Sequence, residues 1–141
     1  MSKTIDEVQA EIVSEFSLFE SWMDKYNYII DLGKSLTRLE DDYLKDDFLV
    51  KGCQSRVWLN ATLDGDRLKF KADSDAIIVK GLIGLLLRVL SDQKPEDIIQ
   101  ADLNFVDKIG LKEHLSPTRS NGLVAMIKQM KLHALAYSSK Q

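Results

Sequence analysis

Apolar residues near the start of the chain recur at helical spacing, with acidic residues on the opposite face. The apolar positions are Ile5, Val8, Ile12, Phe16 and Phe19. A second helical stretch begins near Trp22 and continues to Leu32, and Gly33 is well placed to end it. Residues 4–32 therefore predict two helices.

The next segment, residues 38–47, is acidic and has no clear period. We interpret it as an exposed connection between structural elements. Two interpretations of its charge remain open: a solvated run of side chains, or a docking surface for a basic partner.

From Val57 onward the apolar period changes to two, which is typical of a half-buried strand. The sequence Asp-Gly-Asp at 64–66 predicts a hairpin turn, and the return strand places Leu68, Phe70 and Ala72 on one face. Because two strands alone are marginally stable, residues 48–50 are expected to add a short third strand.

Helices are predicted again in the second half of the chain. Residues 73–75 (Asp-Ser-Asp) are expected to cap a helix that continues through Leu90 and is apolar almost all round, as in a central core helix. Pro95 is suited to begin a short helix, and Ser116 and Pro117 to begin the last one. The buried stripe of the last helix is predicted to be Leu123, Ile127, Met130, Ala134 and Tyr137.

These elements define the predicted fold class, α+β. A small antiparallel sheet of about three strands packs against helices on one side. The chain of 141 residues has the length of one ordinary domain, so residues 1–141 are expected to form a single domain.

Composition and charge narrow the possible partners. The formal net charge is −3 and the sequence contains no strongly basic stripe, so nucleic acid is not expected to bind. The first residues, Met1 to Glu7, become acidic at once and lack an apolar leader segment, which disfavours secretion. The longest apolar stretch is too short to cross a membrane and is interrupted by Lys80 and Arg88. We therefore expect a cytoplasmic protein. Its oligomeric state does not follow from these features, and we expect a monomer or a weak homodimer.

The chain contains one cysteine, Cys53, in the run Lys-Gly-Cys-Gln-Ser-Arg at 51–56. One cysteine cannot form an intrachain disulfide or a Cys-x-x-Cys pair. With only two histidines elsewhere, His114 and His133, the chain also lacks the ligands of a structural zinc site or an iron–sulfur cluster. We expect no metal and no cofactor, so the thiol must act singly.

Cys53 is either a reactive thiol or a small inert apolar residue, and its spacing alone favours neither. Its position at the mouth of a loop, after Gly52, favours reactivity. Lys51 and Arg56 flank it and would favour the thiolate if they faced the sulfur, which neighbours in sequence need not do. No recognisable nucleophile signature accompanies Cys53, which disfavours a cysteine–histidine hydrolase.

Arg119 lies in the first turn of the last predicted helix, where a positive charge opposes the helix dipole. It is interpreted as the partner of a carboxylate such as Asp73 or Asp75, as a contact for another protein, or as an exposed arginine without a role. The sequence around it favours the last interpretation.

Three segments together resemble the SufE family of sulfur-acceptor proteins: residues 50–58 (VKGCQSRVW), 73–81 (DSDAIIVKG) and 115–123 (LSPTRSNGL). Residues 28–33 (YIIDLG) are also similar to the N-terminal region of that family, and the resemblance runs from about residue 10 to the last helix. The family shares its fold with cluster scaffolds of the IscU type. Those scaffolds use three cysteines, so a chain with one cysteine does not fit the scaffold role.

The resemblance implies a function. A SufE-like protein accepts persulfide sulfur from a SufS-type cysteine desulfurase, stimulates that enzyme, and passes the sulfur to an iron–sulfur scaffold complex. Cys53 would form the persulfide, and pyridoxal phosphate belongs to the desulfurase. The implied loop and partner contacts are Gly52, Gln54, Ser55, Arg56, Asp75 and Arg119.

Two rival functions remain. One is a thiol-dependent enzyme that uses Cys53 as a nucleophile on a small molecule, and the other is an adaptor whose cysteine is incidental. Because a persulfide benefits from shelter, we expect the carrier to hide Cys53 against apolar residues and to open its loop on docking.

Overall fold

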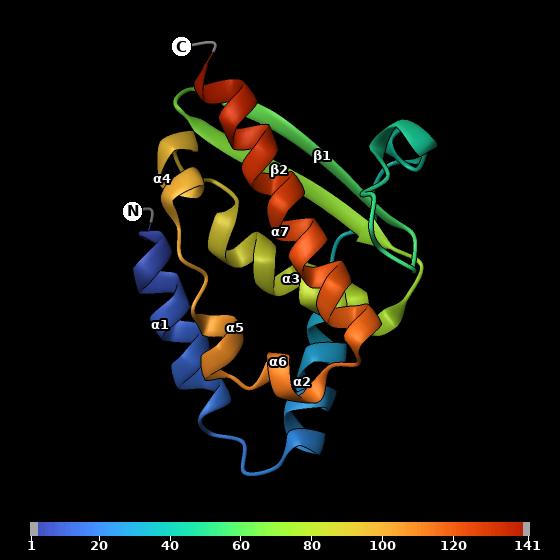
Figure 1. Cartoon of the computed structure of the whole chain (residues 1–141), viewed down its shortest axis with the longest axis vertical. Coiled ribbons are helices and arrows are strands. Elements are labelled where there is room, and N and C mark those ends of the chain that lie inside the picture. The colour runs from blue at the N-terminus through green and yellow to red at the C-terminus, as the bar shows by residue number, and fades with distance from the viewer. Residues whose placement is uncertain (1–2, 140–141) are drawn as a thin grey trace.

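The computed structural model describes residues 3–139 (Figure 1). Met1 and Ser2 belong to the N-terminal segment in which the sequence predicts no apolar leader, and they lie outside the described residues. The elements in chain order are α1 (Ile5–Phe16), α2 (Trp22–Lys34), the 3-10 turns η1 (Asp41–Tyr43) and η2 (Asp46–Phe48), β1 (Val57–Asp64), β2 (Arg67–Ser74), α3 (Ile77–Leu90), α4 (Pro95–Gln100), α5 (Phe105–Lys108), α6 (Leu111–His114) and α7 (Pro117–Ser138). The predicted α+β class is confirmed.

The two N-terminal helices form as predicted, but Gly33 does not end the second one. Helix α2 continues to Lys34, with Ser35 as its C-cap. Gly33 instead lies where α2 crosses α3: a Cβ built on it would lie 2.7 Å from the backbone nitrogen of Gly81. A Cβ on Gly81 would lie only 2.0 Å from the carbonyl oxygen of Ile29. Both glycines are therefore required by the close approach of the two helices.

Strands β1 and β2 form the predicted antiparallel hairpin around a turn in which Gly65 has φ +63°. Leu59 pairs with Ala72 and Ala61 with Phe70, so the apolar sides of both strands share one face. The expected third strand is wrong. Leu49 only bridges Trp58, and the chain turns away from β1 at Gly52, so the described sheet has two strands.

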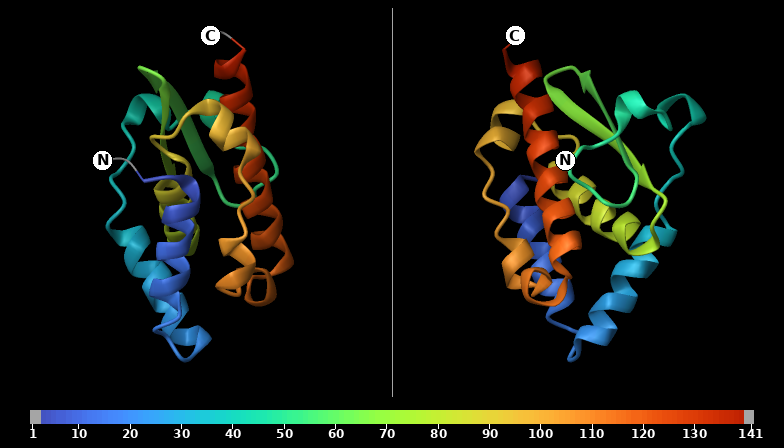
Figure 2. Two further views of the ribbon diagram at one scale, coloured as in Figure 1. Left: turned by 90° about the vertical axis from the view of Figure 1, so that its left-hand side faces the viewer. Right: turned by 45° about the vertical axis from the view of Figure 1, so that its right-hand side comes forward.

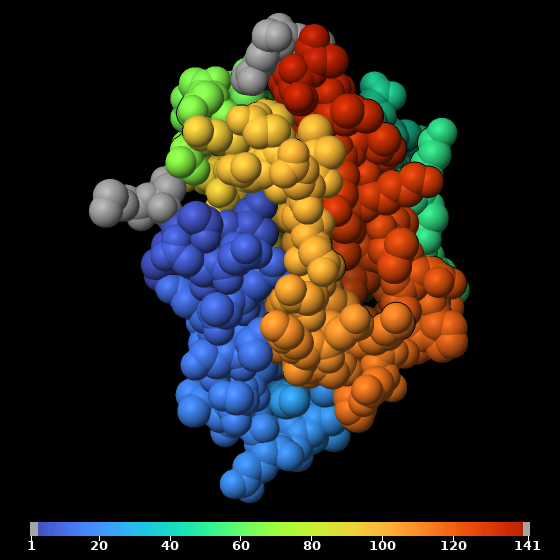
Figure 3. Space-filling model, turned by 60° about the vertical axis from the view of Figure 1, so that its left-hand side comes forward, coloured from blue at the N-terminus to red at the C-terminus, as the bar shows by residue number. Residues whose placement is uncertain are grey.

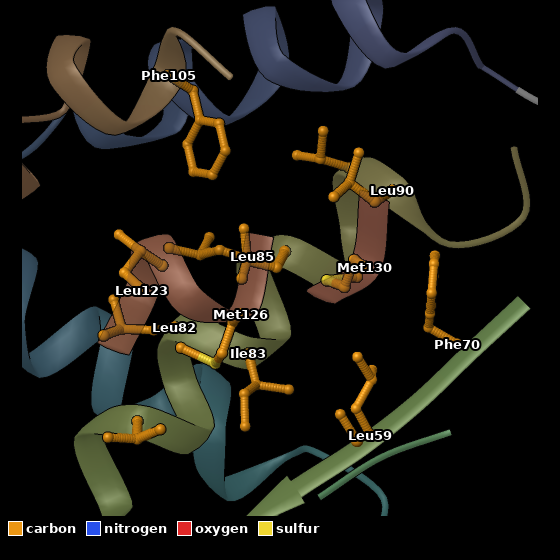
Figure 4. Packing of buried hydrophobic residues seen from close by; sticks show 14 of the residues in the cluster. Leu59, Phe70, Leu82, Ile83, Leu85, Leu90, Phe105, Leu123, Met126 and Met130 are labelled. Atoms are coloured by element: carbon orange, nitrogen blue, oxygen red, sulfur yellow. The ribbon is translucent and has the colours of Figure 1, made fainter. Parts of the chain in front are cut away.

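Helix α3 is the central helix of the core, as its pattern predicts. Figure 4 shows Leu82, Ile83 and Leu85 of α3 around Met126 of α7, with Ile83 on the side that faces Leu59 of the hairpin. The predicted cap at 73–75 is wrong, because β2 runs through Ser74 and the N-cap of α3 is Ala76, without a side-chain hydrogen bond. Asp73 is buried, accepts a hydrogen bond from the Leu39 N–H (3.1 Å), and joins residues 36–40 to the sheet.

Helix α7 begins at Pro117 with Ser116 as its N-cap, and α4 begins at Pro95, both as predicted. Helices α3 and α7 cover the same face of the hairpin (Figures 1 and 2). Figure 3 shows α1, the segment from α4 to α6, and α7 side by side on one surface of the molecule. The buried residues of α7 are Gly122, Leu123, Met126, Met130 and Ala134, whereas Ile127 and Tyr137 are half-buried.

The acidic connection projects beside the hairpin and contains η1 and η2 (Figure 2). Its charged side chains are exposed, as predicted, but Leu39 is buried. Within residues 3–139, no helix combines the length and the apolar character that crossing a membrane requires.

Candidate functional site

Cys53 lies on the loop of residues 50–56, which joins η2 to β1 and rests on α7. Gly52 has φ +93°, a conformation that side-chain-bearing residues rarely adopt, and a Cβ on it would lie 3.2 Å from the Cβ of Ala125. The Cys53 S–H donates to the carbonyl oxygen of Gly122, with Sγ and O 3.5 Å apart. A Cβ on Gly122 would lie 3.6 Å from Sγ, so the loop contacts a face of α7 that carries small residues.

The far end of the loop is fixed to the end of β2. The backbone N–H of Arg56 donates to Asp75 Oδ1 (3.1 Å), and the backbone N–H of Asp75 donates to the Arg56 carbonyl (3.3 Å). The hydroxyl of Ser74 donates to the same carbonyl at 2.7 Å. The structure therefore brings Asp75 to the cysteine loop, although the two residues lie far apart in the sequence.

A pocket of about 410 Å³ lies beside Cys53, between its loop, α3 and the start of α7. Its polar lining consists of Gln54, Ser55, Ser116, Thr118 and Arg119, and its apolar lining includes Val57, Val79, Leu82 and Met126. Arg119 therefore shares a pocket with Cys53. Of the other predicted contacts, Gly52, Arg56 and Asp75 lie outside the described lining.

Burial controls the electrostatics of the thiol. Cys53 is half-buried, and this desolvation raises the pKa of its thiol because the anion loses hydration. Lys51 and Arg56 are not among the causes of this pKa shift, so their positive charges do not favour the thiolate in this conformation. Both side chains are exposed, and neighbours in sequence need not approach the sulfur.

Arg119 does not pair with either carboxylate that the sequence suggests. Asp73 lies 3.6 Å from the ammonium group of Lys80, and Asp75 binds the backbone of Arg56. Across residues 3–139, the guanidinium of Arg119 has no ion pair and no hydrogen bond to a side chain or carbonyl. Among these residues it is thus an unpaired cation at the pocket.

Neither histidine reaches the cysteine. His114 stacks on Trp22 with ring centroids 4.5 Å apart, and His133 lies beside Phe70. Burial lowers the pKa of His133. The part of the chain that the structure describes contains no group of three or more His, Cys, Asp or Glu residues able to hold a metal ion.

Sequence reasoning missed the residues of α7 that support Cys53 and the hydroxyls of the pocket. Gly122 and Ala125 could have been found from the helical pattern, because a glycine at an otherwise apolar position of a helix signals close packing. Ser116 was predicted only as a helix start, and nothing local in the sequence marks Thr118 as a pocket residue.

Comparisons with known proteins agree with this architecture. The family model described as "SufE: Fe-S metabolism associated domain" matches residues 10–134. An uncharacterised SufE-like protein of Rhizobium meliloti is 39% identical over 129 residues, covering 88% of this chain and 92% of the relative. A similar protein of Rhizobium etli is 38% identical over 129 residues, covering 88% and 87%.

A solved structure shows the same fold. The solution structure of a hypothetical protein from Thermus thermophilus has a TM-score of 0.77, with 18% sequence identity, and the match covers 94% of this chain and 96% of that one. The fold and the site thus define a small α+β protein with one half-buried cysteine beside a pocket. The chain belongs to the SufE family, and this membership fits a sulfur-acceptor role in general.

Proposed function

We propose that this protein accepts persulfide sulfur from a cysteine desulfurase of the SufS type onto Cys53, stimulates that enzyme, and passes the sulfur to iron–sulfur cluster assembly. The observation that carries the proposal is the position of Cys53. This chain belongs to the SufE family, and its one cysteine lies beside a pocket. The loop that carries the cysteine contacts α7 and is fixed at its far end by Asp75.

The transfer needs one nucleophile and one leaving group. The Cys53 thiolate attacks the outer sulfur of the desulfurase persulfide, a new S–S bond forms at Cys53, and the desulfurase cysteine leaves as a thiolate. No net oxidation occurs, so the carrier needs no cofactor or resolving cysteine. Pyridoxal phosphate remains with the desulfurase, where it releases sulfur from free cysteine.

The loop is proposed to move when the desulfurase docks. In the resting position, burial raises the pKa of Cys53 and holds it as a thiol, which is a poor nucleophile. The bond to the Gly122 carbonyl comes from a weak S–H donor, so leaving the pocket costs little hydrogen-bond energy. Gly52, Gln54 and Ser55 would form the moving segment. Asp75 would fix its far end at Arg56, and Arg119 would lie at its docking side.

The rival enzyme hypothesis receives less support from the same geometry. A thiol-dependent enzyme acting on a small molecule needs a general base near its cysteine. The described lining of the pocket contains no histidine, aspartate or glutamate. A carrier does not need this base to take up sulfur, because loading takes place when its loop has opened toward the desulfurase.

The test is desulfurase turnover, measured as alanine release from cysteine with and without this protein. The native chain should increase turnover, and Cys53→Ser should remove the increase while keeping the same unfolding midpoint. Cys53→Ala separates loss of the thiol from any effect of the serine hydroxyl. Undiminished stimulation by both variants would show that Cys53 does not carry the sulfur.

A further inference from the structure

Arg119 lines the Cys53 pocket with its charge unpaired among the described residues. No carboxylate within residues 3–139 pairs with it, and no carboxylate is found among the described lining residues. A guanidinium binds carboxylates well because its planar N–H groups can donate two parallel, charge-assisted hydrogen bonds. Arg119 is exposed, so its guanidinium at the pocket is accessible to an incoming anion.

The rest of the pocket has the size and polarity of a small-molecule site. Its volume of about 410 Å³ lies at the small end of the range for ligand pockets, roughly 300–1,000 Å³. The hydroxyls of Ser55, Ser116 and Thr118 and the amide of Gln54 line one part, and four apolar side chains line another. A compact molecule with a polar end and an apolar stem matches this division.

The chemistry of the lining also restricts the ligand. The pocket offers a cation and a cysteine but no base among the described residues. It therefore suits a molecule that arrives already charged and needs no proton removed by the protein. A thiolate that also bears a carboxylate meets both conditions.

We propose that the pocket binds a small thiol bearing a carboxylate, with Arg119 holding the carboxylate, and that this thiol can take the outer sulfur from Cys53. The proposal rests on the persulfide of the proposed function. The incoming thiolate attacks the outer sulfur of Cys53–S–SH. A bond forms between the incoming sulfur and the outer sulfur, the bond from the outer sulfur to Cys53 breaks, and Cys53 leaves as a thiolate. The products are a small-molecule persulfide and the unloaded carrier, without an external oxidant or reductant.

The experiment starts from protein whose Cys53 is loaded chemically with inorganic polysulfide, so no desulfurase is involved. Loss of the persulfide is followed by intact mass after adding mercaptopropionate or its neutral isostere mercaptopropionamide. Native and Arg119→Gln proteins are compared for each thiol. The ratio of their rates cancels the intrinsic reactivity of the thiol.

For mercaptopropionate, Arg119→Gln should slow the transfer about fivefold to tenfold, the usual effect of losing one charge-assisted contact. For mercaptopropionamide the two proteins should react at nearly the same rate, and Arg119→Lys should restore part of the preference. Lys51→Gln is the matched control: this lysine is nearer to Cys53 in sequence but lies outside the described pocket lining. It should leave the carboxylate preference unchanged.

Three results would overturn the inference: equal slowing of both thiols by Arg119→Gln, no slowing of either, or an equal loss of preference in Lys51→Gln. An effect of Arg119→Gln on desulfurase loading alone would assign the arginine to the protein partner instead. If polysulfide fails to load Cys53, NMR titration of Cys53→Ser with mercaptopropionate decides. Saturable shifts at Thr118 and Gly122 that disappear with Arg119→Gln support the pocket, and their absence rejects it. Failure of the desulfurase to load Cys53 would refute the proposed function but not this result.

Discussion

Two contacts in this molecule are made at glycines, and they differ in how much room they leave for a side chain. Where α2 crosses α3, a Cβ on Gly81 would lie 2.0 Å from a backbone oxygen, so neither helix can move aside cheaply. Where the cysteine loop rests on α7, a Cβ on Gly122 would lie 3.6 Å from Sγ, which is ordinary van der Waals contact. At the helix crossing, a side chain on either glycine would meet backbone atoms of the other helix. At the loop contact, a side chain on Gly122 would meet the side chain of Cys53 at an ordinary distance.

The difference separates a rigid frame from a movable loop. The α2–α3 crossing belongs to the core that positions the hairpin and α7. The loop is attached by one weak S–H bond and by backbone bonds around Arg56. A carrier needs this arrangement, because its cysteine must leave the pocket while its scaffold stays folded.

The largest effect should come from closing the tight crossing. Gly81→Ala should destabilise the fold by more than about 3 kcal/mol, because the new methyl group meets the backbone of Ile29. Urea unfolding measures the loss. The matched control is Gly84→Ala in the same helix, where the nearest atom lies 3.9 Å away and helix propensity should add up to about 1 kcal/mol. Equal effects of the two variants would show that the crossing is not closed.

A substitution at the loop contact should change the reactivity of Cys53 more than the stability of the fold. Gly52→Ala should cost about 1–2 kcal/mol, because alanine resists φ +93° and meets Ala125. The alkylation rate of Cys53 should rise severalfold as the loop leaves α7. Gly65→Ala is the control, since it has φ +63° but no neighbour within 4 Å. If both variants changed alkylation equally, the contact with α7 would not hold the loop.

Removing the anchor at the far end of the loop should have a smaller effect. Asp75→Ala deletes the acceptor of the Arg56 N–H and should cost about 1 kcal/mol or less, since Asp75 is exposed. Asp75→Asn keeps an oxygen acceptor and should cost less than the alanine variant. Cys53 alkylation should rise in the same order. A larger cost for asparagine than for alanine would argue against this hydrogen bond.

The smallest effect should be a pH dependence of the loop contact. Burial raises the pKa of Cys53 in the folded chain, so the folded state holds this proton more tightly than the unfolded state. The resulting stabilisation is complete below the unfolded pKa of about 8.5 and is lost as pH rises through the folded value. Above pH about 8.5, the unfolding free energy of the native protein should therefore fall relative to that of Cys53→Ser. A difference that stays constant with pH would contradict the burial of the thiol.

The sequence predicts correctly those helices and strands whose positions are determined by local residue patterns. Helical spacing located α1 and α2, period-two alternation located the hairpin, and proline located the start of α4 and α7. The loop position of Cys53 followed from Gly52 and the strand after it. These features depend on residues close together in the chain.

The predictions that the structure corrects concern residues whose conformation depends on contacts with distant segments of the chain. Local pattern predicts a helix end at Gly33, whereas the structure shows that this glycine is required by a contact with Gly81 of another helix. Local pattern also predicts a helix cap at residues 73–75, whereas β2 continues through Ser74 because it pairs with β1. The pocket itself was not predictable, since it forms only where the loop, α3 and α7 meet. For the same reason, no residue near Arg119 in the sequence indicates that it lies at the pocket beside Cys53.

The central claim is that Cys53 accepts sulfur, and intact mass spectrometry tests it most directly. The protein is incubated with a cysteine desulfurase and cysteine, and its mass is recorded before and after reductant. We predict the addition of one or more sulfur atoms that reductant removes, located on Cys53 by peptide mapping and absent from Cys53→Ser. An unchanged mass with an active desulfurase, or sulfur added equally to Cys53→Ser, would contradict the account.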